Sequence, residues 1–428
     1  MYNRNQQRQN TKTYDIHPVS IKLIKQGNPW ITLDSFSEKF HPKDKFIIAS
    51  NRQKPFALLL HDPSHKNVRA RVWSTNGNFQ RSIKNFKNDL AQRISNSIAK
   101  RIDKKYIEKR NNFYFIFGES DKIPGLFVQF LNGEIIIQFY MDFWKPYQEF
   151  IIQNVLSITN QKFNLDLTIS NIWVQSRSAD KIKPKCLDPN TSFKNITINE
   201  FGVNYKVLLG KYYDHGIYTD MSQTRAKLES IIKGSNKVLN LFCYTGAFSL
   251  YSLKLGASEV VSVDLSEKYI NWLEENISLN PDIESSKHNS MTCSTLDALG
   301  ELKSKNREFD FIISDPPSSS SDGNTKSNAL NDYQKTLPLI TDLLSEGGKA
   351  LVFLNTHKCS LKKFEDRIKQ TISRKKLPLK ISRRFFLDGD CPSQKGFPEG
   401  SYLKGILVEK SINSTQLNSQ AEVEKEVK

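Results

Sequence analysis

The stretch LNLFCYTGAFSL, residues Leu239–Leu250, decides the fold of the C-terminal half of this 428-residue chain. An apolar strand leads into a tight turn at Tyr244, Thr245 and Gly246, and a helix is expected directly after it. Gly246 would let the backbone approach a ligand, and the first turn of a helix presents N–H groups without partners inside the helix. Ligands of parallel sheets bind at the carboxyl ends of the strands. The stretch therefore predicts a ligand site at the end of this strand.

The residues around this stretch alternate between expected strands and expected helices. Strands are predicted at Val238–Phe242, Glu259–Asp264, Phe309–Ser314 and Lys349–Leu354. Helices are predicted at Phe248–Lys254, Glu267–Leu279, Leu330–Leu344 and Leu361–Ser373. Such alternation indicates an α/β domain with a doubly wound, mostly parallel, Rossmann-like sheet.

A carboxylate ends the second of these strands, 18 residues after the glycine turn. Asp264, the last residue of VVSVD, can accept hydrogen bonds from both hydroxyls of a ribose. Charged hydrogen bonds of this kind contribute on the order of 1.5–3 kcal/mol. The turn contains one glycine instead of the GxGxxG motif that binds a pyrophosphate, and this favours a nucleoside ligand without phosphates. The alternative is an ordinary β-α-β crossover in which the aspartate occurs by chance.

A third motif, Asp315-Pro316-Pro317, ends the predicted strand FDFIISD. Its two prolines fix a rigid turn and remove two backbone donors, so carbonyl and carboxylate acceptors face the site. Such a group can hold a flipped base or an amine while its nitrogen attacks a sulfonium methyl. We therefore expect these three residues to position the methyl acceptor and S-adenosylmethionine to be the cofactor. A plain loop is the alternative.

The segment DHGIYTDMSQTR, Asp214–Arg225, precedes the first strand of the predicted sheet. It combines a glycine turn with Tyr218, Asp220 and Arg225. We expect it to close over the cofactor or to orient the substrate. A helix cap at Asp220 explains the same residues equally well.

The N-terminal half has a different pattern. Short strands predicted at Lys45–Ala49, Phe56–Leu60 and Val68–Trp73 indicate a small β-barrel. Beyond them, an amphipathic helix within Phe79–Arg110 precedes strands at Phe113–Phe117, Leu126–Phe130 and Glu134–Phe139, a helix at Tyr147–Ser157, and a strand at Ile169–Gln175. This second group indicates a middle α/β domain, followed by a loop or linker at Ser178–Asn195.

These patterns divide the chain into five parts. We predict a disordered arm (1–15), a small barrel domain (16–78), a middle α/β domain (79–205), the Rossmann-like domain (206–410) and a disordered tail (411–428).

Composition narrows the class of protein. The chain has 62 basic and 45 acidic residues, a net charge of +17, which favours a polyanionic partner, and a merely soluble basic protein is the alternative. No apolar run approaches the roughly 18 residues that span a bilayer, and the polar N-terminus does not suit a secretory signal. The five cysteines are scattered without a CxxC pair. We therefore expect a cytoplasmic protein without a metal, a membrane or a disulfide framework.

The motifs resemble those of the large-subunit ribosomal RNA methyltransferases that join an N-terminal PUA domain to a class I methyltransferase domain. Eight ordered matches between about Ile21 and Glu409 carry the resemblance: NPW (Asn28–Trp30), VRARVWS (Val68–Ser74), GESDKIPG (Gly118–Gly125), HGIYTDMSQTR (His215–Arg225), FCYTGAFS (Phe242–Ser249), VVSVDLS (Val260–Ser266), SDPP (Ser314–Pro317) and FPEGSYLKG (Phe397–Gly405). The resemblance implies S-adenosylmethionine as methyl donor and 23S ribosomal RNA, or a precursor of the large subunit, as substrate. It also implies that the barrel is PUA-like and helps to hold the RNA. The oligomeric state, a homodimer included, stays open.

The motifs and the resemblance together define the predicted site. The cofactor is expected to contact Tyr218, Asp220, Arg225, Phe242, Tyr244, Thr245, Gly246, Ala247, Phe248, Asp264, Leu265 and Ser294. The substrate is expected to contact Asn355, and exposed Arg69 and Arg71 are expected to contact RNA phosphates.

Two departures from the family pattern bear on the target atom. Relatives that methylate cytosine at carbon-5 use a cysteine after the strand that corresponds to Lys349–Leu354, and its thiolate adds to the base. This chain has Asn355 there, and Cys359 lies four residues further, up to about 13 Å away if extended. Asparagine at this place resembles relatives that methylate guanine at nitrogen-7, so a guanine nitrogen is favoured.

The fit to the guanine-specific relatives is also incomplete. Serines follow DPP where those relatives have a stacking aromatic, and Ser294 stands where a carboxylate is expected near the adenine. Carbon-5 methylation through Cys359 and a non-catalytic RNA-binding or assembly factor on a degenerate scaffold therefore remain as alternatives. A small-molecule methyltransferase is a weaker third one.

Overall fold

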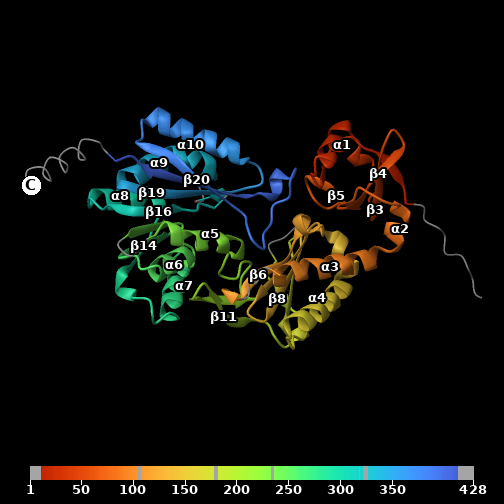
Figure 1. The fold of residues 1–428 in the computed structure, drawn as a ribbon, viewed down its shortest axis with the longest axis horizontal. Coiled ribbons are helices and arrows are strands. Elements are labelled where there is room, and N and C mark those ends of the chain that lie inside the picture. The colour runs from red at the N-terminus through yellow and green to blue at the C-terminus, as the bar shows by residue number, and fades with distance from the viewer. Residues whose placement is uncertain are drawn as a thin grey trace, which may run out of the picture. The chain divides into compact units, whose positions relative to one another are not determined.

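The structure, a computed structural model, describes residues 11–103, 108–177, 182–232, 236–317, 319–321 and 326–412. The chain divides into two compact units (Figure 1). Unit 1 comprises the chain up to Ile198 together with Val207–His215 and Asp390–Gly400. Unit 2 comprises Asn199–Lys206, Gly216–Gly389 and the chain from Ser401. The domain boundary predicted after residue 205 thus lies in a region where the chain passes between the units more than once.

The first sheet of unit 1 has five strands in the order β1-β3-β4-β5-β2. Their bounds are Thr13–Asp15 (β1), Trp30–Thr32 (β2), Phe46–Asn51 (β3), Lys54–His61 (β4) and Val68–Ser74 (β5). The strands predicted in this region are present. Helix α1 (Pro18–Lys25) was not predicted, because its buried side chains occupy only two turns. The disorder predicted for the arm is wrong for Thr13–Asp15, which pairs with β3, and residues 1–10 lie outside the described residues.

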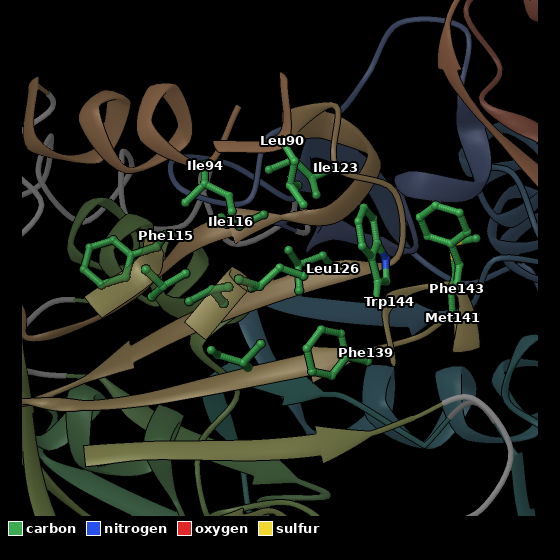
Figure 2. Close-up of a cluster of buried hydrophobic side chains, with 14 of the residues drawn as sticks. Leu90, Ile94, Phe115, Ile116, Ile123, Leu126, Phe139, Met141, Phe143 and Trp144 are labelled. Atoms are coloured by element: carbon green, nitrogen blue, oxygen red, sulfur yellow. The ribbon is translucent and has the colours of Figure 1, made fainter. Parts of the chain in front are cut away.

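The second sheet of unit 1 has the order β10-β9-β8-β7-β6. Its strands are Asn112–Phe117 (β6), Leu126–Leu131 (β7), Glu134–Phe139 (β8), Ile172–Ser176 (β9) and Lys185–Cys186 (β10), and the helices of this region are Phe79–Lys84 (α2), Phe86–Asp103 (α3) and Gln148–Phe163 (α4). Leu90 and Ile94 of α3 pack over Ile116 and Leu126 of the sheet (Figure 2). The predicted helix and strands of the middle region are therefore present around one apolar core.

The sheet of unit 2 has seven strands in the order β15-β14-β13-β16-β19-β21-β20. Their bounds are Lys237–Leu241 (β13), Glu259–Asp264 (β14), His288–Thr292 (β15), Phe309–Ser314 (β16), Leu344–Asn355 (β19), Leu379–Phe386 (β20) and Leu403–Lys410 (β21). The pairings among β15, β14, β13, β16 and β19 are parallel, and β21 pairs antiparallel with both β19 and β20. This confirms the predicted Rossmann-like, mostly parallel sheet.

Helices cover both faces of this sheet. They are Ser222–Ala226 (α5), Ala247–Lys254 (α6), Glu267–Ser278 (α7), Thr295–Ser304 (α8), Ala329–Leu343 (α9) and Leu361–Lys375 (α10). Figure 1 shows α9 and α10 on one face and α6 and α7 on the other. The side chains of α8, α9 and α10 form one buried cluster with the strands.

The remaining elements are short. Strands β11 (Lys194–Glu200) and β12 (Val203–Leu209) pair with each other, as do β17 (Ser319–Ser321) and β18 (Lys326–Asn328). The 3-10 helices lie at Ser37–Lys39, Gly118–Asp121, Asp142–Tyr147, Ile169–Asn171, Thr219–Met221, Lys227–Ser230, Ser285–Lys287 and Pro398–Gly400. Parts of the predicted linker (178–181), of the serine loop after DPP (318 and 322–325) and of the tail (413–428) lie outside the described residues.

The strand order places the predicted site residues together. The order reverses between the neighbours β13 and β16, and a crevice for ligands forms at the carboxyl ends of strands at such a switch point. Asp264 ends β14, Asp315 follows β16 and Asn355 ends β19. Residues distant in sequence therefore meet at one edge of the sheet.

Candidate active site

A cavity of about 1290 Å³ lies in unit 2, lined by residues that follow β13, β14, β16 and β19 and by residues of α8, α9 and α10. Typical small-molecule sites have volumes of roughly 300–1,000 Å³. The cavity thus has room for a cofactor and for part of a second molecule. Predicted site residues that line it are Tyr218, Asp220, Arg225, Phe242, Tyr244, Ala247, Phe248, Asp264, Leu265, Ser294, Asp315, Pro316, Pro317 and Asn355.

The turn after β13 has a left-handed backbone at three positions. The φ angles are 58° at Phe242, 52° at Tyr244 and 82° at Gly246. Non-glycine residues in this region cost on the order of 1–3 kcal/mol each and cluster at binding sites. A Cβ atom at position 246 would lie 2.4 Å from Cγ of Leu273 in α7. Packing against α7 therefore requires a glycine at this position, and the predicted contact of Gly246 with the cofactor remains a prediction.

Thr245 is buried and is not one of the residues that line the cavity. Its hydroxyl donates a hydrogen bond to the carbonyl of Gly216 at 2.6 Å. Its own carbonyl accepts a hydrogen bond from the amide of Asn276 at 2.9 Å. Thr245 thus ties the turn to the segment that contains Tyr218 and to α7.

The carboxylate of Asp264 is held by backbone donors. Its Oδ2 accepts the N–H of Tyr244 and its Oδ1 accepts the N–H of Ser266, both at 2.9 Å. Burial raises the pKa of Asp264, and these backbone hydrogen bonds act in the opposite direction. A carboxylate has about four acceptor positions, so two remain for hydroxyl groups of a ligand.

Aromatic and apolar side chains surround this end of the cavity. The ring of Tyr244 lies 5.2 Å from that of Tyr218 and 4.5 Å from that of Tyr269. Leu265 is 69% exposed and Leu296 of α8 is 49% exposed, although both line the cavity. Tyr269 and Leu296 were not predicted, because an aromatic or apolar residue on a helix is more often part of a core.

Ser294 lines the cavity and begins a helix. Its hydroxyl accepts the N–H of Asp297 at 3.2 Å and lies 2.6 Å from the carboxylate of the same residue, to which it donates. This side chain is the N-cap of α8. The predicted contact with adenine remains a hypothesis.

Asp315 also lines the cavity and lies on the other side of β13 from Asp264, because β16 and β14 flank that strand. The amide of Asn355 donates a hydrogen bond to its Oδ1 at 2.8 Å. Burial and the nearby negative charge of Asp220 raise the pKa of Asp315 to about 7, while Asn355 and Arg225 act against this rise. The hydroxyl of Tyr402 donates a hydrogen bond to Asp220. Asp315, Asn355, Asp220 and Tyr402, called the acceptor end below, therefore form one polar group.

A buried tyrosine that was not predicted supports this end. The hydroxyl of Tyr333 in α9 lies 3.0 Å from the carbonyl oxygen of Ser314 and 2.8 Å from that of Phe353. It therefore joins the ends of β16 and β19. This fixes the strand ends that carry Asp315 and Asn355.

Arg225 lines the cavity, but its guanidinium is already bound. Nε and Nη2 lie 2.6 and 3.0 Å from the two carboxylate oxygens of Glu200, and Nη2 donates to the carbonyl of Tyr218 at 3.1 Å. Both charged side chains are buried. Arg225 therefore holds the backbone of Tyr218, and a direct contact with the cofactor remains a prediction.

The two arginines predicted to contact phosphates lie in unit 1, where one of them is buried. Arg71 is 4% exposed and forms an ion pair with Glu119, so the prediction that it is exposed is wrong. Glu119 also accepts a hydrogen bond from the indole of Trp30 at 2.8 Å. Alternation along a strand cannot reveal that a charge is paired inside. Arg69 is half-buried and donates to the carbonyls of Pro63 and His65 at 2.8 and 3.2 Å.

Cys359 does not line the cavity. Its side chain belongs to the buried cluster of α8, α9, α10 and the sheet, and it is 7% exposed. Burial raises the pKa of its thiol, although Lys404 and two other cations act against this rise. Neither feature suits a nucleophile that must reach a bound base.

Two features are absent from the described residues. Within them, no group of three or more His, Cys, Asp or Glu side chains could hold a metal ion. No helix there is long and apolar enough to cross a membrane.

Known proteins resemble this chain in sequence and in structure. A family model described as S-adenosylmethionine-dependent methyltransferase matches residues 185–365. Ribosomal RNA large subunit methyltransferase I of Aliivibrio fischeri is 25% identical over 394 residues, which cover 90% of this chain and 96% of that protein. Ribosomal RNA large subunit methyltransferase of Deinococcus radiodurans is 24% identical over 395 residues, with coverage of 90% and 94%.

Two solved structures share the fold over nearly the whole chain. SMU.776, a candidate methyltransferase crystallised with S-adenosylhomocysteine, has a TM-score of 0.79 at 18% identity and covers 93% of this chain and 99% of its own. A candidate S-adenosylmethionine-dependent methyltransferase from Streptococcus mutans has a TM-score of 0.78 with the same identity and coverage. Residues 185–365 thus match the model of the S-adenosylmethionine-dependent methyltransferases, and nearly the whole chain shares its fold with the two solved structures.

Proposed function

We propose that this methyltransferase transfers a methyl group to a base of ribosomal RNA, with 23S RNA or a precursor of the large subunit as substrate. The observation that carries the proposal is the shared cavity, with Asp264 at one end and Asp315 with Asn355 at the other. The names of the two curated relatives and the net charge of +17 support RNA as the partner.

The residues around Asp264 fit S-adenosylmethionine. The carboxylate keeps acceptor positions for ribose hydroxyls, and Leu265 and Leu296 offer exposed apolar faces to an adenine ring. When bound, the cofactor supplies an electrophilic methyl group on a sulfonium. Tyr244 contributes at this end by fixing Asp264 through its backbone N–H.

The acceptor end fits a flipped base. Enzymes that act on an extruded base hold its Watson–Crick edge by hydrogen bonds, and Asp315 can accept from the N–H groups of a guanine edge when it is ionised. Asn355 holds the carboxyl group in place. Catalysis would then come mainly from the proximity and orientation of the base nitrogen relative to the methyl group.

Tyr402 supplies the aromatic ring that the loop after DPP lacks. It lines the cavity, its hydroxyl binds Asp220, and it directly precedes β21, in which Leu403 pairs with Asn355. These three links connect Tyr402 to the acceptor end, which includes Asp315. Flipped or single-stranded bases commonly stack on such rings.

A guanine nitrogen is the target that this arrangement supports. The reaction at nitrogen needs no enzyme nucleophile, whereas reaction at carbon-5 of cytosine needs a thiolate next to the base. The cavity lining contains Cys243 but not Cys359, and burial raises the pKa of the Cys243 thiol far above its usual range.

The test is methyl transfer from labelled S-adenosylmethionine to large-subunit RNA purified from a strain that lacks the gene, followed by mass spectrometry of the nucleosides. We expect labelled methylguanosine and no covalent adduct with RNA that contains 5-fluorocytosine. Labelled 5-methylcytosine, with an adduct that disappears in Cys359→Ser, would instead establish the carbon-5 reaction. Cofactor binding without any transfer would identify a non-catalytic RNA-binding factor.

A further inference from the structure

One short stretch of the chain carries a large share of its positive charge. Residues 361–386 contain ten basic and two acidic side chains, a net charge of +8 against +17 for all 428 residues. The stretch comprises α10, the turn after it and β20, which is the last strand in the order of the seven-stranded sheet. Neither the fold nor the cofactor site requires this concentration of charge.

Ion pairs account for only part of these cations. Glu365 lies 2.7 Å from both Lys369 and Arg384, and Glu409 lies 3.7 Å from Lys380. Arg383 donates a hydrogen bond to Ser230. The side chains of six other cations have no ion pair or hydrogen bond within the described part of the chain: Lys362, Lys363, Arg367, Arg374, Lys375 and Lys376.

Three of these six lie on one flank of α10. Lys363, Arg367 and Arg374 have the spacing i, i+4 and i+11, which places them on the same side of a helix over about 16 Å. Phe364 and Ile368 are the buried positions of the same helix. The charged flank therefore runs beside the face that packs into the core.

This flank reaches the cavity at Arg367, which lies between Lys363 and Arg374 along α10. Arg367 is one of the lining residues, and Lys335, an exposed residue of the adjacent helix α9, is another. Lys335, Lys363, Arg367 and Arg374 are called the cation row below. The row combines residues of the cavity rim with residues that continue outward along α10.

We infer that the cation row binds phosphates of the RNA strand that carries the target base, so that this strand leaves the cavity along α10. The inference rests on the proposed function, because a base that enters the cavity must bring its flanking phosphates to the rim. Lysine and arginine contacts with phosphates fix the position of a strand without reading its sequence. They release counterions, and this makes the affinity depend on salt.

The experiment compares the full-length chain with a triple variant, Lys363→Gln, Arg367→Gln and Arg374→Gln. Binding to a uridine oligonucleotide is measured by fluorescence anisotropy over a series of salt concentrations. Each lost phosphate contact on a single strand lowers the slope of log K against log salt by about 0.7, so we expect a reduction of about 2 and an affinity at least about tenfold lower. Binding of S-adenosylhomocysteine, measured by calorimetry, should stay unchanged and shows that unit 2 is folded.

The matched control removes the same charge elsewhere in unit 2, by Lys287→Gln, Lys303→Gln and Lys305→Gln. Lys287 precedes α8, Lys303 lies within it and Lys305 directly follows it. Its oligonucleotide affinity and salt slope should stay close to those of the unchanged chain. Equal losses in both triple variants, or no loss in the cation-row variant, would overturn the inference. Absence of methyl transfer by the unchanged chain together with a reduced salt slope in the cation-row variant would contradict the proposed function but leave the cation row as an RNA site.

Discussion

Two aspartates mark the two ends of the cavity, and they are held in different ways. Asp264 ends β14 and Asp315 follows β16, and both strands pair with β13. Two backbone N–H groups bind Asp264, one from the adjacent turn and one two residues away. The amide of Asn355 binds Asp315, and a second carboxylate, Asp220, lies close to it.

Because of these different partners, Asp264 is a hydrogen-bond acceptor with a fixed position, whereas Asp315 is an acceptor whose charge depends on pH. Burial raises the pKa of Asp264, but its backbone donors act against this rise and favour the ionised form, which suits a group that accepts hydrogen bonds from ribose hydroxyls. Burial and Asp220 instead favour the protonated form of Asp315 and raise its pKa to about 7. One end of the cavity is therefore set by the main chain, and the other depends on side chains from distant segments.

The largest effect is expected for Asp315→Ala. Loss of the group that orients the base should reduce the methylation rate by about 100-fold, since small misplacements of a reacting group have effects of this size. The affinity for S-adenosylhomocysteine should change less than about twofold, because Asp315 lies at the acceptor end. A rate within a few-fold of the unchanged chain in single-turnover assays with saturating cofactor would show that Asp315 does not position the base.

Asp264→Ala is expected to weaken cofactor binding and to leave RNA binding unchanged. Loss of charged hydrogen bonds of on the order of 1.5–3 kcal/mol should weaken cofactor binding by at least about tenfold. Calorimetric titration with S-adenosylhomocysteine measures this, and oligonucleotide binding is the control that should not change. Unchanged affinity would remove the ribose assignment and with it the contrast between the two ends.

A pair of substitutions at Tyr402 tests the acceptor end more finely. Tyr402→Leu removes the ring and should raise the KM for RNA by about fivefold or more, because stacking of a base contributes roughly 1–3 kcal/mol. Tyr402→Phe keeps the ring and removes only the hydrogen bond to Asp220, so its KM should stay near that of the unchanged chain. Equal KM values for the Leu and Phe variants would contradict the stacking role.

The smallest effect concerns stability and pH. The folded pKa of Asp315, about 7, lies above the ordinary value of 3.8, so the folded chain holds this proton more tightly than the unfolded chain. Its contribution to stability is complete below pH 4 and is lost as the pH rises through about 7. Asp315→Asn does not titrate, so its Tm relative to the unchanged chain should be higher at pH 8 than at pH 5.

Asp220→Asn provides a second test of the pH dependence of the Tm. It removes the negative charge that helps to raise the pKa of Asp315, so the pH at which this stability is lost should move downward. Tm differences for Asp315→Asn that are equal at pH 5 and pH 8 would contradict the assignment of the raised pKa.

The sequence predicted the cofactor end better than the acceptor end. The turn, Asp264 and the first two strands lie within about 30 residues, and their pattern is that of a local strand-turn-helix unit. Arg367 and Tyr402 were missed because each joins the cavity from a separate segment, and Tyr333 was missed because its hydroxyl contacts two strand ends that are distant in sequence. Strand β15 was missed because it is an edge strand with mostly exposed, polar residues.

Long-range contacts also explain the errors. Arg71 was predicted to be exposed on its strand, but its partner Glu119 lies 48 residues further along the chain. Gly246 was assigned to the approach of a ligand, and the structure adds a second reason for the glycine, because Leu273 of α7 occupies the space that a side chain would need. In both cases the residue type indicated a special position, but the contact that explains the residue is made by a segment distant in sequence.

The sequence by itself determined the Rossmann-like sheet, the turn after its first strand and the carboxylate that the turn holds. These features depend on apolar periodicity and on residues close together in the chain. Only the tertiary structure decided that Thr245 binds the carbonyl of Gly216, that Tyr402 binds Asp220 in the cavity lining, and that Arg367 of the charged flank of α10 lines the cavity. Those relations arise when strands distant in sequence pair at one sheet edge, because side-chain neighbours there are set by strand order and register.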